Sequence, residues 1–123
     1  MPDIWRIYHV RNSPHTTPTK DKFVVIVCID NTPLGFFINS NIHPYVQNRP
    51  KLLECQILIR ASDNWFLNHD SYIDCTQLYQ FGDDNLVDGR EIANEEIKNE
   101  IKRVVSNATL IEKRYRNSIL NNP

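Results

Sequence analysis

Polar side chains stand at one end of the most apolar segment of the chain. One apolar run covers residues 23–29, and a second run, residues 34–38, follows after turn-forming residues at 30–33. The two runs predict a buried hairpin. Lys22 directly precedes the first run, and four hydrogen-bonding residues follow the second: Asn39, Ser40, Asn41 and His43. We expect a closed, mostly antiparallel sheet to bring Lys22 and the end of the second run into a common pocket on a rigid rim.

Each of these side chains also has a plainer structural interpretation. Lys22 fits an ordinary edge lysine that solvates the start of a strand. Asn39 and Ser40 have the side chains that satisfy backbone groups in turns. His43 precedes Pro44 and is therefore expected in extended backbone, either as a solvated loop residue or as a proton shuttle near neutral pH.

A second histidine stands beside a carboxylate in the segment NHDSYIDC. His69 and Asp70 are adjacent, and adjacent residues of a strand point to opposite faces, so the two can cooperate only in a turn. We predict a turn in which Asp70 accepts hydrogen bonds from backbone amides.

The cysteines are odd in number and widely spaced. Cys28, Cys55 and Cys75 form no C-x-x-C pair, and Cys28 and Cys55 fall at apolar strand positions, which favours buried thiols. The alternative is a zinc site with His9, His43 or His69 as further ligands. Neither paired-ligand spacing nor a helical H-x-x-x-H pattern supports it.

Bulk composition narrows the class of protein. The 123 residues suit one domain with one core, and no apolar run approaches the roughly 20 residues that span a bilayer. The first ten residues lack the pattern of a signal peptide, so we expect a cytoplasmic protein without membrane contact. The formal charge of −1 means that nucleic-acid phosphates would have to be held by a local basic patch.

Hydrophobic patterning predicts a mainly β domain with a C-terminal helix. Further strands are expected at residues 4–10, 52–61, 71–75 and 78–81, and a long loop at 11–21. Residues 3–81 would form the barrel, residues 94–108 an amphipathic helix that begins at Asn94, and residues 109–123 a tail or second short helix. Strand pairs without intervening helices favour antiparallel pairing in a small barrel or curled sheet with the helix packed on it.

Four short segments, in this order, resemble one protein family. DIWRIYHV is similar to an opening GDI(V/Y)-x-V strand, and KFVVIVCID to an RPVVVIQND strand. FFINSN lies where that family has a strand ending in (I/P)-x-T-S, and the segment from YIDCTQLYQF to EEIKNEIKRVV resembles its closing strand and helix. The family is that of the PemK/MazF (Kid/CcdB-like) toxins of bacterial toxin–antitoxin systems, and the likeness covers most of residues 3–105.

The resemblance implies a fold and an activity. Members have an SH3-like antiparallel barrel with a C-terminal helix, usually form homodimers, cleave single-stranded RNA without a metal or cofactor, and are blocked by an antitoxin protein. Lys22 occupies the place of the family's arginine and Ser40, or Asn39, that of its hydroxyl residue. Pro2 replaces an early glycine, Phe23 replaces a proline, and lysine lacks the two-pronged grip of arginine on phosphate.

We accordingly expect an RNA-cleaving groove at the rim. Its expected catalytic residues are Lys22, Ser40 and His43, and its expected substrate-binding residues are Asn39, Asn41, His9 and Arg11. The alternative is a non-catalytic protein-binding module on the same scaffold, either a CcdB-like poison of a protein target or an inactive relative, which would use the aromatic side chains of Trp5, Tyr8, Tyr45 and Trp65. A basic groove around Lys22 would favour RNA, and an apolar or acidic groove would favour protein.

Overall fold

A long hairpin forms the centre of the molecule. The structure is a computed structural model that describes residues 2–10 and 22–123. Strands β2 (Lys22–Asp30) and β3 (Thr32–Asn39) pair along their length and are joined at Asn31, which adopts a left-handed backbone with φ 63°. The predicted hairpin is therefore confirmed, with a turn shorter than expected.

The described strands form one antiparallel sheet in the order β4-β5-β3-β2-β1-β7, with β6 paired to β3. The other strands are β1 (Arg6–Val10), β4 (Gln56–Ile59), β5 (Ser71–Asp74), β6 (Tyr79–Gln80) and β7 (Leu86–Ile92). β4 and β7 stand at the two ends of this order and do not pair within the described residues, so the expected closure of the sheet is not found there.

Strand β7 extends the sheet beyond the range 3–81 predicted for it. β7 pairs with β1, and the pairing shifts register between Ile7 and His9, where Asp88 has a φ of 52°. Such a bulge interrupts the period-2 alternation that identifies a strand in a sequence. The pattern of Leu86–Ile92 therefore gave no strand signal.

Two short helices occupy a segment predicted as a loop followed by a strand. These are α1 (Pro44–Gln47) and α2 (Pro50–Leu53), each with a proline in its first turn, where proline is well tolerated. The predicted strand at residues 52–61 is correct only for β4, and Leu53 is 40% exposed instead of facing the core. Short 3₁₀ helices follow at η1 (Ala61–Asp63) and η2 (Asp83–Asn85).

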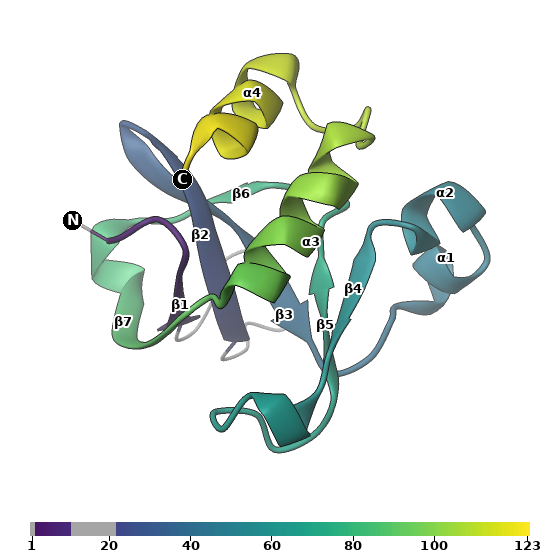
Figure 1. Cartoon of the computed structure of the whole chain (residues 1–123), viewed down its shortest axis with the longest axis horizontal. Helices are drawn as coiled ribbons and strands as arrows, with labels where there is room; N and C mark the ends of the chain where they lie inside the picture. Colours follow the sequence, from purple (N-terminus) through teal and green to yellow (C-terminus); the bar gives the residue numbers. More distant parts are fainter. Residues whose placement is uncertain (1, 11–21) are drawn as a thin grey trace.

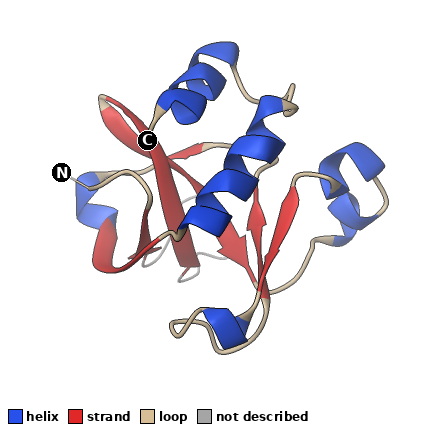
Figure 2. Ribbon diagram, viewed as in Figure 1, coloured by secondary structure: helices blue, strands red, loops and turns tan. Residues whose placement is uncertain are grey.

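Helices cover one face of the sheet. Helix α3 (Glu95–Ser106) crosses the strands, and α4 (Lys113–Asn121) packs beside it (Figure 1; Figure 2). The side chain of Asn94 accepts a hydrogen bond from the Ile97 amide at 2.8 Å, which confirms the predicted N-cap. The predicted apolar stripe is buried against the sheet, and it consists of Ile97, Ile101, Val104, Val105 and Ala108.

Both faces of β2 are buried, which explains its continuous apolar sequence. Val25 and Val27 belong to the main core under α3 and α4, whereas Val24 and Ile26 pack on the other face with Phe37. Cys28, Cys55 and Cys75 are buried free thiols, as predicted. Within the described residues, no helix combines the length and apolarity needed to cross a membrane.

Candidate functional site

Lys22 and Asn39 meet where β2 begins and β3 ends. Phe23 pairs with Ile38, and the same register extended by one residue places Lys22 opposite Asn39. The Nζ atom of Lys22 donates to Oδ1 of Asn39 at 2.9 Å, in a partly buried position. The hairpin register therefore brings together two of the residues that the sequence suggested.

Two hollows flank Lys22, each with a volume of about 310 Å³. Lys22 lines both of them. The first, here called the His69 hollow, is lined by Lys22, Phe23, Ile38, Ser40, Phe66, Leu67, Asn68, His69 and Ser71. The second, here called the Asp74 hollow, is lined by Lys22, Phe37, Asn39, His43, Tyr45, Val46, Asp74 and Tyr79.

Strand alternation explains why Ser40 and Asn39 lie in different hollows. Successive residues of a strand point to opposite faces. Ser40 therefore lies on the same face as Ile38, and Asn39 lies on the same face as Phe37. The β3–β5 pairing of Ile38 with Ile73 continues to place Asp74 opposite Phe37. The expected catalytic residues are thus divided: Lys22 shares one hollow with Ser40 and the other with His43.

The position of His43 limits what its ring can do. Its Nδ1 atom accepts a hydrogen bond from the Tyr45 amide at 3.1 Å and thereby caps α1. A neutral imidazole that accepts at Nδ1 carries its proton on Nε2. His43 therefore presents a hydrogen-bond donor, and accepting a further proton at Nδ1 would break the cap.

Two further expected site residues, His9 and Asn41, lie outside the two hollows. The ring of His9 packs against Phe23 with centroids 5.5 Å apart, and His9 lines neither hollow. Asn41 is exposed and its amide nitrogen is 3.5 Å from the Ser40 hydroxyl. Arg11, with the loop at residues 11–21, lies outside the described residues.

Three lining residues were not among the predicted catalytic and substrate-binding residues, namely His69, Asp74 and Tyr79. His69 lines a hollow beside Ser40, and the neighbouring Asp70 accepts a hydrogen bond from the Ala61 amide at 2.9 Å, which confirms the predicted turn. Asp74 and Tyr79 line the other hollow. Burial raises the pKa of the Tyr79 hydroxyl, and the charge of Asp74 raises it further. Asp74 and Tyr79 reach β3 only through the β3–β5 and β3–β6 pairings, so no local sequence pattern identifies these two residues as part of the site.

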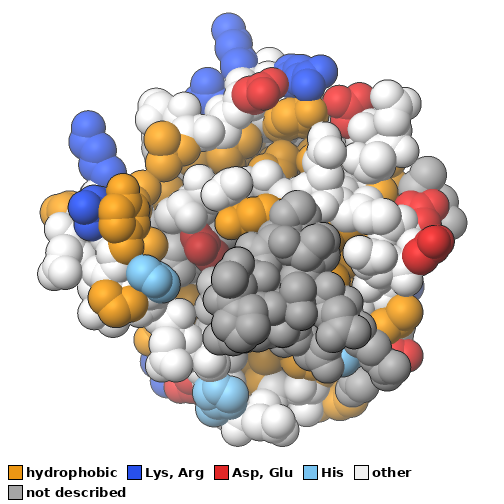
Figure 3. Space-filling model, turned by 180° about the vertical axis from the view of Figure 1, so that it is seen from behind, with side chains coloured by type: hydrophobic (Ala, Val, Ile, Leu, Met, Phe, Trp, Pro, Cys, Tyr) orange, Lys and Arg blue, Asp and Glu red, His pale blue; other side chains and the backbone are white. Residues whose placement is uncertain are grey.

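The charges around Lys22 are nearly balanced. Among the described residues that line the two hollows, Lys22 is the one lysine or arginine and Asp74 the one carboxylate. The side of the molecule opposite to that in Figure 1 carries histidine and hydrophobic side chains, and its lysine and arginine side chains stand mainly at the edges (Figure 3). As far as the described residues show, the lining of the two hollows is therefore neither strongly basic nor strongly acidic.

Two of the four aromatic residues suggested for protein binding belong to the core. Trp5 is 4% and Tyr8 9% exposed, so neither can contact a partner. Tyr45 and Trp65 are 56% and 67% exposed. In the described part of the chain, no cluster of three or more His, Cys, Asp or Glu side chains is placed to hold a metal ion.

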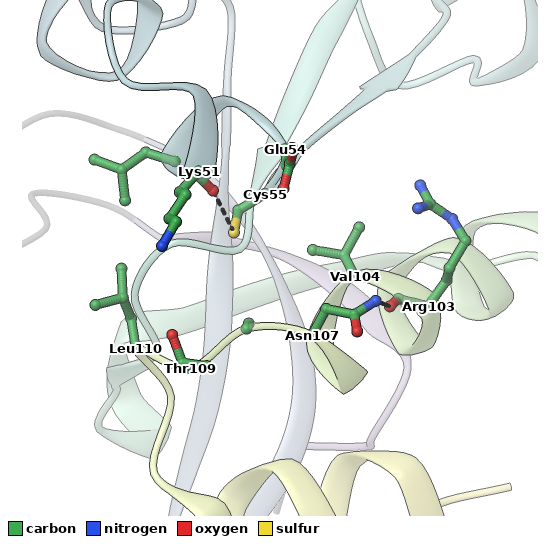
Figure 4. Close-up of a pocket in the computed structure, with 10 residues that line it drawn as sticks. Lys51, Glu54, Cys55, Arg103, Val104, Asn107, Thr109 and Leu110 are labelled. Carbon is green, nitrogen blue, oxygen red and sulfur yellow. Dashed lines mark hydrogen bonds between the residues drawn. The ribbon is translucent and has the colours of Figure 1, made fainter.

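A larger cavity, of about 620 Å³, lies between α2 and the end of α3. Its lining includes Leu52, Cys55, Val104, Ala108 and Leu110 and shares no residue with the two hollows at Lys22. The Lys51 side chain extends from α2 toward Thr109 and Leu110, while the Arg103 guanidinium points away (Figure 4). Arg103 is paired with Glu100 at 2.6 Å.

The chain matches no known protein-family model and no curated protein.

Proposed function

We propose that the chain is a PemK/MazF-like toxin that cleaves single-stranded RNA without a metal ion. The single observation that carries this proposal is the position of Lys22, which is hydrogen-bonded to Asn39 and shared by two hollows that contain Ser40, His43 and His69. The open sheet with α3 across it would then be a variant of the SH3-like barrel. The protein would act in the cytoplasm, as a homodimer, under the control of an antitoxin.

The proposed reaction is an internal transfer of the phosphodiester. His69 takes the proton of the ribose 2′-hydroxyl, and the 2′-oxygen attacks the neighbouring phosphorus. The bond from phosphorus to the 5′-oxygen breaks, and the leaving oxygen takes a proton from the Lys22 ammonium, which solvent then restores. The products are a 2′,3′-cyclic phosphate and a 5′-hydroxyl end.

The other polar groups stabilise charge in this proposal. The Lys22 ammonium and the Ser40 hydroxyl, which line the same hollow as His69, are donors to the phosphorane oxygens, where negative charge develops in the transition state, and the Nε2–H group of His43 is a donor to the RNA in the other hollow. Asn39 fixes the lysine head group through the bond to Nζ. His43 serves here as a donor because its Nδ1 lone pair is used by the Tyr45 amide.

The test is cleavage of a long single-stranded RNA in EDTA by the purified protein. Lys22→Met keeps the length of the side chain and removes the charge, and it should lower the cleavage rate by about 100-fold or more. Lys51→Met is the matched control, because Lys51 is an exposed lysine outside both hollows. Thermal unfolding of each variant separates lost chemistry from lost folding.

The ends of the products test the mechanism separately. Polynucleotide kinase should label the new 5′ ends without prior phosphatase treatment, since they carry a free hydroxyl. Full activity of a folded Lys22→Met variant would remove Lys22 from the site. Absence of cleavage by the wild-type protein on several unrelated RNAs would overturn the proposed activity.

A non-catalytic protein-binding module is the second candidate. One observation favours it, namely that the charges of the described residues that line the two hollows nearly cancel, whereas proteins that hold nucleic acid through phosphates usually gather basic residues. On this alternative the wild-type protein would cleave no RNA. It would bind a protein target through the surface around Tyr45, and Tyr45→Ala would weaken that binding.

A further inference from the structure

The Asp74 hollow contains aromatic groups that the proposed chemistry does not use. Phe37 is 6% exposed and forms part of the wall, with the Tyr79 ring 4.8 Å from it, centroid to centroid, at a tilt of 60°. Tyr45 lines the hollow from α1. Aromatic side chains that line a hollow beside a cation are the usual platform on which bases of single-stranded RNA stack.

The Tyr45 ring is held in place by Arg49. The guanidinium carbon of Arg49 lies 3.6 Å from the centre of the Tyr45 ring, and its Nη1 atom donates to the Tyr45 carbonyl at 2.7 Å. Tyr45 is 56% exposed despite this contact. The ring therefore offers a planar ligand a fixed surface with little loss of side-chain freedom on binding.

Asp74 is fixed at the same hollow through only one of its carboxylate oxygens. Oδ1 accepts from Gln56 Nε2 at 2.8 Å, from the Thr76 amide at 3.0 Å and from the Thr76 hydroxyl. Among the described residues, no hydrogen bond to Oδ2 is found. Asp74 therefore holds one acceptor oxygen in a set position for a ligand that brings an N–H donor.

The surrounding charges decide which kind of donor fits. A cationic ligand would meet the positive charge of Lys22, which lines this hollow, and that of Arg49, which lies over the Tyr45 ring, and like charges repel. A neutral ring with an amino group, carried on a chain with a negative phosphate, would satisfy Asp74 and Lys22 together. A nucleotide of single-stranded RNA has this combination.

We propose that the Asp74 hollow binds the base of a nucleotide next to the cleaved phosphate and selects bases with an exocyclic amino group. Cytosine, adenine and guanine can donate from that group to Oδ2 of Asp74. Uracil presents carbonyl oxygens instead and would place one near the carboxylate. This inference rests on the proposed RNA cleavage and adds a substrate preference to it.

The test uses short oligouridine substrates in which a single position is varied. The wild-type protein should cleave beside cytidine with a kcat/KM about tenfold higher than beside uridine, since a hydrogen bond to a charged group is lost with uridine. Asp74→Asn should reduce this ratio to near one, because an amide can donate to a uracil carbonyl. Asp70→Asn is the matched control and should keep the ratio, since Asp70 bonds the Ala61 amide and lines neither hollow.

A second measurement changes the substrate and leaves the protein intact. Replacing the single cytidine by its analogue without the 4-amino group should lower kcat/KM of the wild-type protein about tenfold. This result does not depend on whether Asp74→Asn folds. Cleavage with equal rates beside cytidine, uridine and the analogue would overturn the inference and leave the proposed function standing. Absence of any cleavage by the wild-type protein would overturn both.

Discussion

The ammonium of Lys22 and the side-chain oxygen of Asn39 lie 2.9 Å apart, although 17 positions separate the two residues in the chain. The contact joins the first residue of β2 to the last residue of β3, so it reports on the register of the hairpin. It also places the one lysine of the two hollows, among the described residues, at the boundary between them.

Removing the acceptor at Asn39 should impair cleavage more than folding. Asn39→Leu deletes the oxygen that holds Lys22, and we expect a roughly tenfold lower cleavage rate with a loss of about 1 kcal/mol in the free energy of unfolding. Asn39→Asp keeps an acceptor and should retain more activity than the leucine variant. Asn117→Leu on α4 is the control for loss of an exposed amide. Equal cleavage by wild type and Asn39→Leu would contradict a positioning role for Asn39.

The charge of Lys22 should be visible in the salt dependence of RNA binding. For single strands, the logarithm of the binding constant falls with the logarithm of salt concentration by about 0.7 per phosphate contact. Lys22→Gln should therefore make the slope shallower by about 0.7. Fluorescence anisotropy with 2′-O-methyl RNA, which lacks the attacking hydroxyl, gives this slope without cleavage.

Lys51→Gln serves as the control for that measurement and should leave the slope unchanged. Parallel salt plots for wild type and Lys22→Gln would mean that Lys22 does not contact phosphate.

The hairpin core should not tolerate a side chain at Gly35. A Cβ atom added there would lie 2.4 Å from the Val25 carbonyl oxygen, in the paired strand. Backbone on both sides cannot move without breaking ladder hydrogen bonds, so Gly35→Ala should lower the free energy of unfolding by about 3 kcal/mol. Urea denaturation measures this change.

Gly82→Ala is a matched control for that substitution. The nearest atom to its added Cβ is Asn85 Oδ1 at 3.9 Å, and its φ of −77° suits any residue. Its stability should be unchanged or up to about 1 kcal/mol higher. Similar losses for the two alanine variants would contradict the close approach of β2 and β3 at Gly35.

Alkaline pH should destabilise the fold through Cys28. Burial, with a smaller contribution from the charge of Asp30, raises the pKa of the Cys28 thiol from 9.0 to about 11. The unfolded state then releases the proton first as pH rises, so stability is intact below pH 9 and is lost between about pH 9 and 11. The loss in the free energy of unfolding would be about 3 kcal/mol at most.

The measurement compares urea midpoints of wild type and Cys28→Ala across this range. The alanine variant starts from lower stability because of the smaller side chain. Its free energy of unfolding should nevertheless fall less steeply from pH 9 to 11, because unfolding releases up to one proton fewer than in the wild type. An identical decline in both proteins would contradict the raised pKa of Cys28.

Local sequence determined the elements whose signals lie within a few residues. The apolar runs specified β2 and β3, and the stripe from Ile97 to Ala108 specified α3 with Asn94 as its cap. Because an antiparallel hairpin places the start of its first strand beside the end of its second, the proximity of Lys22 to Asn39 also followed from sequence. Burial of Cys28 and Cys55 followed from their places at apolar positions of predicted strands.

Tertiary structure alone decided the rest of the site. The pairing of β5 and β6 with β3 brings Asp74 and Tyr79 beside Lys22, and the alternation of β3 sends Asn39 and Ser40 into different hollows. The sequence also did not predict the pairing of β7 with β1, because the bulge interrupts the alternation of side chains that identifies a strand. These features depend on register between segments far apart in the chain. Side-chain periodicity within one segment predicts which face is buried but carries no information about which strand will lie against it.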